Sequence, residues 1–136
     1  MSRENVEVVR EIYAAVARRD SATPFRFYAD DIVWDATHGL LTGLGNKPVY
    51  HGHEGVREFW RDALSAFGEV DLEVEELIDA GDRVLAVIRE REVGRASGVP
   101  VEASHLAVWT LADGKVTRMQ IFDDRAKALE AAGLRE

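Results

Sequence analysis

The chain has 136 residues, with 17 Lys or Arg against 25 Asp or Glu, so its formal net charge is −8. This length fits one domain over residues 1–136, and the acidic balance argues against nucleic-acid and anionic-membrane partners. The absence of cysteine excludes disulfides and thiolate sites. No apolar run approaches the roughly 18 residues of a membrane span, and no signal peptide is evident, so we expect a cytoplasmic protein.

The N-terminal third combines helical and strand patterns. Apolar residues spaced three and four apart predict an amphipathic helix over 4–19. Thr23-Pro24 predicts a short second helix over 25–29, because proline is favoured in a first helical turn. A β-branched and aromatic run then predicts a strand over 32–36.

The remainder of the chain changes from helical to strand periodicity. Residues 37–50 are rich in glycine and lack a period, which predicts a long loop, and a third helix is predicted from Gly52 to Phe67. From Val70 onward the period is two, and turns separate four predicted strands, which run from 70 to a turn at 80–82, then over 83–93, 99–111 and 115–122.

This order of elements predicts an α+β fold. We expect three N-terminal helices packed on a curved, mostly antiparallel sheet, followed by a short C-terminal helix over 125–132. The two central strands have eleven or more residues. Each spans about 35 Å, which is too long to stay flat, so the sheet should form a cone with an apolar mouth.

Five runs of residues carry a resemblance to a known superfamily. They are 12–15, 27–34, 50–56, 108–116 and 122–124. Together they resemble the nuclear-transport-factor-2-like superfamily, nearest to its SnoaL-like branch of polyketide cyclases and to ketosteroid isomerase-type folds. The resemblance implies a cone-shaped pocket and a homodimer packed through the sheet. This fold hosts isomerases, cyclases, dehydratases, hydrolases and non-enzymatic binders.

The resemblance also suggests catalytic positions. Asp35 falls on the general-base aspartate of the ketosteroid isomerases. Their oxyanion-hole tyrosine maps to Ile12, one residue before Tyr13, and their second oxyanion donor, an aspartate, falls near His105. Two of these three positions are altered, which argues against steroid isomerisation.

The residues themselves leave alternatives open for each candidate. Asp35 is either a carboxylate in the cone, where desolvation would raise its pKa, or a surface residue at a strand end. His105 shares a strand face with Trp109 and is either a proton shuttle or a structural histidine. His38 lies in the glycine-rich loop and is either a lid residue or a solvated one.

Aromatic and histidine side chains supply the expected ligand contacts. Aromatic residues at helix or strand spacing usually pack in a core, but some must line a cone. The expected ligand-binding residues are Phe27, Trp34, Trp60, Trp109 and His51. His51 and His53 form an H-x-H pair, but no further ligand follows at a metal-binding spacing, so we expect no metal site.

These features favour a cofactor-independent enzyme that acts on a small hydrophobic molecule with a carbonyl group. Asp35 would be the general base or acid, His105 or His38 its partner, and Tyr13 a donor to the developing oxyanion. Proton abstraction next to a carbonyl would lead to isomerisation, cyclisation or dehydration. Two alternatives stay open: a domain that binds a hydrophobic ligand or partner without chemistry, and a dimeric domain whose cavity its own side chains fill.

Overall fold

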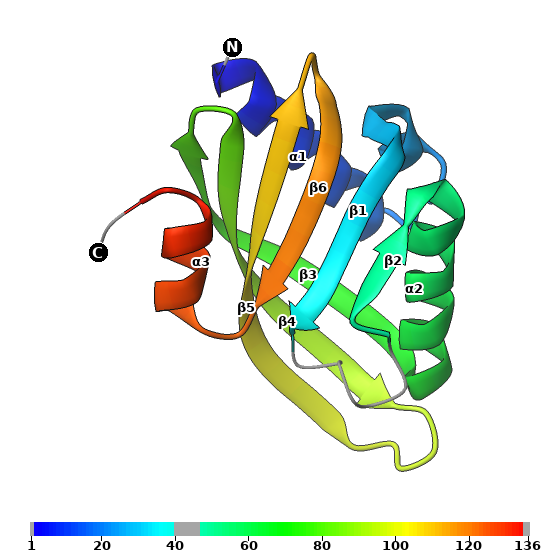
Figure 1. Ribbon diagram of the computed structural model, residues 1–136. Coiled ribbons are helices and arrows are strands. Elements are labelled where there is room, and N and C mark those ends of the chain that lie inside the picture. Colours follow the sequence, from blue (N-terminus) through cyan, green and yellow to red (C-terminus); the bar gives the residue numbers. More distant parts are fainter. Residues whose placement is uncertain (1, 40–46, 135–136) are drawn as a thin grey trace.

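A six-stranded β-sheet forms the centre of the structure, with helices on both of its faces (Figure 1). This computed structural model describes residues 2–39 and 47–134. The helical segments are α1 (Ser2–Ala17), the 3-10 helix η1 (Thr23–Phe27), α2 (Gly52–Ala66) and α3 (Arg125–Ala131). The strands are β1 (Tyr28–His38), β2 (Val49–His51), β3 (Phe67–Ala80), β4 (Arg83–Gly94), β5 (Pro100–Ala112) and β6 (Lys115–Phe122). No helix in the described ranges has the length and apolar character needed to cross a membrane.

The sheet is mixed, with the strand order β2-β1-β6-β5-β4-β3. Strands β3 to β6 are consecutive antiparallel neighbours, and β2 pairs antiparallel with β1. Strands β1 and β6 run parallel, which brings the first strand beside the last. The α+β class and the mostly antiparallel sheet predicted from the sequence are therefore confirmed.

The predicted arrangement of three N-terminal helices is wrong. Among the described elements, only α1 and the short turn η1 precede the first strand, and α2 follows β1 and β2. The segment 25–29 does not form one helix, because the chain extends from Tyr28, which pairs with Val116 of β6. This pairing joins residues far apart in the sequence, so a local pattern could not reveal it.

The predicted loop over 37–50 is also shorter than expected. Strand β1 continues to His38, and Val49–His51 forms β2, which pairs with Val33–Asp35 of β1. Residues 40–46 of this loop lie outside the described residues. Helix α2 begins at Gly52, as the sequence predicts.

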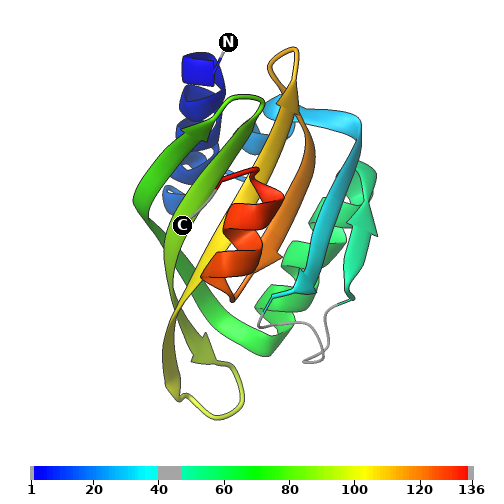
Figure 2. The same ribbon diagram turned by 60° about the vertical axis from the view of Figure 1, so that its left-hand side comes forward.

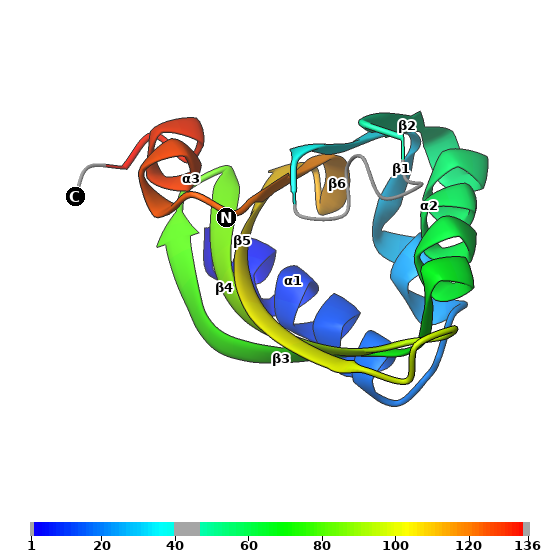
Figure 3. The same cartoon turned by 90° about the horizontal axis from the view of Figure 1, so that it is seen from below.

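The long strands bend strongly, and the bend creates a concave face. In Figure 3, β3, β4 and β5 curve around α1, while α2 lies beside β1 and β2. Helix α3 lies on the opposite face of the sheet, against β5 and β6 (Figure 2). The concave face, α1 and α2 therefore surround one interior region.

Alternate residues of the strands belong to two separate apolar clusters. The inner cluster, on the concave face, includes Val84 and Ile88 of β4. The outer cluster lies between the sheet and α3 and includes Leu85 of β4 and Leu129 of α3. Successive strand residues point to opposite faces, so the even-numbered residues of β4 face the interior and the odd-numbered ones face away.

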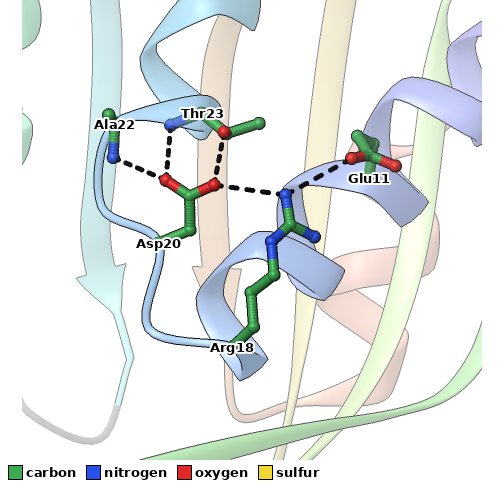
Figure 4. A network of polar contacts seen from close by, with 5 residues as sticks. All are labelled: Glu11, Arg18, Asp20, Ala22 and Thr23. Atoms are coloured by element: carbon green, nitrogen blue, oxygen red, sulfur yellow. Dashed lines mark hydrogen bonds and ion pairs between the residues drawn. The ribbon is translucent and has the colours of Figure 1, made fainter.

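The turn between α1 and η1 is held by Asp20 (Figure 4). Its carboxylate accepts the backbone N–H groups of Ala22 and Thr23 and the hydroxyl group of Thr23. It also pairs with Arg18, which in turn contacts Glu11. The hydrogen bonds from Thr23 lower the pKa of Asp20 to about 2. Asp20 therefore stays ionised and fixes the end of α1 against η1.

Candidate functional site

An inner cavity lies between the concave face of the sheet and helices α1 and α2. The hollow measures about 720 Å³ with its open mouth included, and about 60 Å³ of it has room for a water-sized sphere. Most of the wall is apolar, and its aromatic members are Tyr13, Tyr28, Trp34, Phe59, Trp60 and Trp109.

Three ionisable side chains interrupt this apolar wall. Glu90 and Glu92 come from the inward-facing positions of β4, and His105 comes from β5. Their exposed fractions are only 8%, 2% and 7%, respectively. In the sheet register His105 lies opposite Ile88, one inward position from Glu90, and its Nδ1 contacts the Oε1 atom of Glu90. Buried charges of this kind need partners, and these residues supply one another.

The two acids differ in their protonation. Burial acts to raise the pKa of Glu90, but its close contact with His105 outweighs burial and leaves that pKa below its usual value. Burial, together with the neighbouring Glu90, raises the pKa of Glu92 to about 8. At neutral pH Glu90 is therefore the carboxylate, and Glu92 is a neutral acid that shares its proton with Glu90.

The contact with Glu90 also determines the state of the imidazole ring. An ionised carboxylate only accepts hydrogen bonds, so Nδ1 of His105 carries the proton that faces it. In the neutral ring Nε2 is then unprotonated and basic. His105 lines the cavity, and Nε2 is the ring nitrogen that the contact with Glu90 leaves unengaged.

A hydroxyl donor faces the same cavity from α1. Nε1 of Trp109 donates a hydrogen bond to the hydroxyl oxygen of Tyr13 over 3.1 Å. The indole N–H can only donate, so the hydroxyl proton of Tyr13 remains for a different acceptor. Burial raises the pKa of Tyr13, which keeps this proton in place at neutral pH.

Trp34 supplies a second donor in the wall. Its side chain is buried, and its Nε1 atom has no hydrogen-bond partner among residues 2–39 and 47–134. Buried N–H groups in native proteins are almost always paired. Within the described part of the chain, this indole N–H is therefore a buried donor that no protein oxygen accepts.

Asp35, the general base expected from the sequence, lies outside the cavity. The inward positions of β1 hold Trp34 and Ala36, so Asp35 points to the other face of the sheet. Its carboxylate accepts hydrogen bonds from Arg118 at 3.1 Å and from the backbone N–H of Thr37 at 3.0 Å. Partial burial acts to raise its pKa, but these partners outweigh it and leave the pKa below its usual value. The rise expected for a base in an apolar cone is therefore not found.

Three other candidates also lie away from the described cavity wall. The ring of His38 stacks on that of Phe122, with centroids 5.4 Å apart. His51 is exposed at the end of β2, just before α2. Phe27 is partly buried in η1 and packs against the inner cluster. By contrast, the predicted residues that do line the cavity are Tyr13, Trp34, Trp60, His105 and Trp109.

Glu90 and Glu92 are cavity residues that were not among the predicted site residues, and the sequence offers only a partial signal for them. The even positions Val84, Ala86 and Ile88 are apolar and continue directly into these two acids. The alternate positions of β4 hold arginines that are exposed and pair with acids on the outer face. Within the described ranges, no cluster of three or more metal-binding side chains occurs.

Comparisons with known proteins identify a matching family model and several solved structures with a similar fold. A family model described as a SnoaL-like domain matches residues 9–119. An NTF2-like protein of unknown function from Burkholderia pseudomallei K96243 is 25% identical, with a TM-score of 0.80 over 93% of this chain and 95% of that one. TerC, crystallised with polyporic acid, is 26% identical, with a TM-score of 0.80 over 96% of this chain and 98% of its own.

A third solved structure supports the fold alone. It is described as a SnoaL-like polyketide cyclase from Jannaschia sp. CCS1, and it is 21% identical to this chain. Its TM-score is 0.74 over 96% of this chain and 92% of that one. A search of curated proteins found no match.

Proposed function

The chain belongs to the SnoaL-like domain family, and on that premise we propose that its inner cavity binds a small hydrophobic carbonyl compound and moves a proton on it. The observation that carries this proposal is the Glu90–His105 contact, which is buried in an otherwise apolar wall. An ionisable pair in such a place is costly for folding, and pairs of this kind concentrate at functional sites.

The proposed chemistry is proton transfer next to the carbonyl group. Nε2 of His105 removes a proton from the neighbouring carbon, and the C–H electron pair forms a double bond to the carbonyl carbon. The carbonyl π electrons move onto oxygen and give an enolate, to which Tyr13 donates its free hydroxyl proton in a hydrogen bond. Glu90 stabilises the imidazolium, which then returns the proton to the substrate. Return to a different atom is an isomerisation, and attack of the enolate on a second carbonyl is a cyclisation.

Neutral Glu92 has a supporting role in this scheme. Its raised pKa limits the cavity to a single carboxylate at neutral pH, so the enolate oxygen forms beside one negative charge and not two. Trp34 offers a further N–H to a ligand oxygen. The enzymatic and the binding hypotheses from the sequence thus share one cavity and differ in whether His105 transfers a proton.

Two measurements test the proposal. Binding of polyporic acid, the compound crystallised with TerC, is measured by calorimetry. Proton transfer is measured as deuterium uptake next to the carbonyl of 2-tetralone in D₂O, followed by proton NMR. We expect saturable acceleration that falls about 100-fold or more in His105→Gln, with binding preserved.

Glu102→Gln is the matched control, since Glu102 is exposed on β5 and pairs with the outward arginines of β4. It should exchange deuterium like the unmodified protein. If 2-tetralone saturates the cavity without faster exchange, the acid–base proposal fails and the binding hypothesis stands. If neither compound binds, the cavity is not a ligand site.

A further inference from the structure

A second hollow, the outer cleft, adjoins the inner cavity. It lies between the end of α1, η1 and α2, and it holds about 1170 Å³ of space, open solvent included. Four residues line both hollows, namely Val16, Tyr28, Trp60 and Val70. The two hollows therefore share part of their lining and lie next to each other.

Arginines surround this cleft, although the chain as a whole is acidic. Arg19, Arg57 and Arg61 line it. The acid that lines it is Asp20, which its own hydrogen bonds with Thr23 and its pairing with Arg18 already engage.

Two of the three arginines are already engaged by protein groups. Arg19 donates to the backbone oxygen of Val70 at 2.9 Å and to Asp71 at 2.7 Å. Arg57 donates to Glu54 at 2.6 Å, and its guanidinium lies 4.6 Å from the centre of the Phe25 ring. Both side chains therefore shape the cleft.

Arg61 differs from these two. Its guanidinium has no hydrogen-bond or ion-pair partner among residues 2–39 and 47–134. It projects from α2, one residue after Trp60, whose ring belongs to both hollows. A free planar cation beside an aromatic wall matches a carboxylate on a flat apolar molecule.

From this arrangement we infer that the ligand is an elongated amphipathic carboxylate, whose acid group pairs with Arg61 in the outer cleft while its apolar body enters the inner cavity. The inference rests on the proposed function, since it assigns a substrate class to the same site. The carboxylate stays near solvent and the apolar part is buried, so neither group is desolvated without compensation.

Three probes separate the parts of this inference. They are biphenyl-4-carboxylate, its neutral analogue biphenyl-4-carboxamide, and benzoate, which has the acid but only one ring. Dissociation constants are measured by calorimetry at low and moderate salt. The unmodified protein should prefer the biphenyl carboxylate to the carboxamide about fivefold, and Arg61→Gln should abolish that preference without weakening the carboxamide.

The control for charge is Arg125→Gln. Arg125 is exposed on α3, on the opposite face of the sheet, so this variant removes the same charge and should keep the fivefold preference. A preference that survives in Arg61→Gln, or that disappears equally in Arg125→Gln, overturns the inference.

The depth of entry is read from Trp34, which lines the inner cavity and not the outer cleft. In protein labelled with ¹⁵N-tryptophan, three indole N–H signals are expected from the three tryptophans, and Trp60→Phe and Trp109→Phe assign them. Biphenyl-4-carboxylate should shift the Trp34 signal, and benzoate should leave it in place. An unshifted Trp34 signal at saturating biphenyl-4-carboxylate contradicts the two-part site. Failure of deuterium exchange alone would refute the proposed chemistry and leave this binding result standing.

Discussion

Trp109 on β5 donates its indole N–H to the hydroxyl oxygen of Tyr13 on α1, and their rings meet edge to face with centroids 5.5 Å apart. The bond joins the sheet to the first helix in the wall of the inner cavity. It also frees the Tyr13 proton for a ligand, because the indole group cannot accept it. One hydrogen bond thus connects the packing of the core to the chemistry proposed for the cavity.

Removal of this hydroxyl group is the first prediction. Tyr13→Phe should slow deuterium exchange of 2-tetralone by about 100-fold, as expected for the loss of one oxyanion donor. It should also lower the free energy of unfolding by about 1–2 kcal/mol, because the Trp109 N–H is left buried without a partner. Exchange kinetics and urea unfolding measure the two effects. A variant that loses stability but keeps its exchange rate would reduce Tyr13 to a packing residue.

Glu92→Gln is expected to stabilise the protein at neutral and alkaline pH. The folded state holds the Glu92 proton up to about pH 8, whereas the ordinary pKa is 4.5. Between these values unfolding releases a proton, so stability falls as the pH rises and is fully reduced above pH 8. Glutamine imitates the neutral acid and removes this loss, which should add about 1–3 kcal/mol at pH 8 and little at pH 4.5. Urea unfolding across this range measures the difference. The control Glu102→Gln keeps Glu92, so its stability should fall with pH as it does in the unmodified protein.

The affinity for a ligand should also depend on whether Glu92 is protonated. Above about pH 8, Glu92 becomes a second carboxylate in the inner cavity, beside Glu90. The apolar body of a ligand then packs against a second buried charge, so the affinity should decline from pH 7 to pH 9. Calorimetry with biphenyl-4-carboxylate measures this decline. The profile should be flat in Glu92→Gln, and a decline that persists there would assign the effect to another group.

The Asp35→Asn variant tests two competing roles for Asp35. The resemblance to ketosteroid isomerases implies that it is the general base, whereas the structure places it outside the cavity. The carboxylate of Asp35 pairs with Arg118 on the face away from the cavity, so this variant should keep its deuterium exchange rate within about twofold. Its stability should fall by only about 0–1 kcal/mol, because Arg118 is largely exposed. Loss of exchange in a folded Asp35→Asn variant would return the general base to Asp35 and contradict the role assigned to His105.

Local sequence patterns predicted the secondary structure where neighbouring residues determine it. The period-two run from Val70, the turn at 112–114 and the start of α2 at Gly52 all appear as predicted. The extension of β1 to Tyr28 and the short strand β2 depend on pairing between distant segments. Such pairings are stabilised by tertiary contacts that no local pattern carries.

The residues of the candidate site were also predictable only in part from local sequence patterns. The alternation of side chains along the predicted strand puts His105 and Trp109 on the same face, and both residues line the cavity. The resemblance to ketosteroid isomerases suggests Asp35 as the general base. The alternation of side chains along β1, however, points Asp35 to the face away from the cavity. Glu90 lies in a run of alternating acids and arginines, and such residues on a strand usually face solvent. The deciding information was the direction of each β4 side chain, which depends on which face of the sheet is concave.

The alternation of side chains along β4 has one more consequence. Its even positions carry Glu90 and Glu92 and its odd positions carry Arg89 and Arg91, while the preceding residues are apolar on both faces. A slip of one residue in strand pairing would therefore exchange carboxyl groups for guanidinium groups inside the hollow. The pairing of β4 with β3 and β5 thus determines whether acids or arginines line the inner cavity.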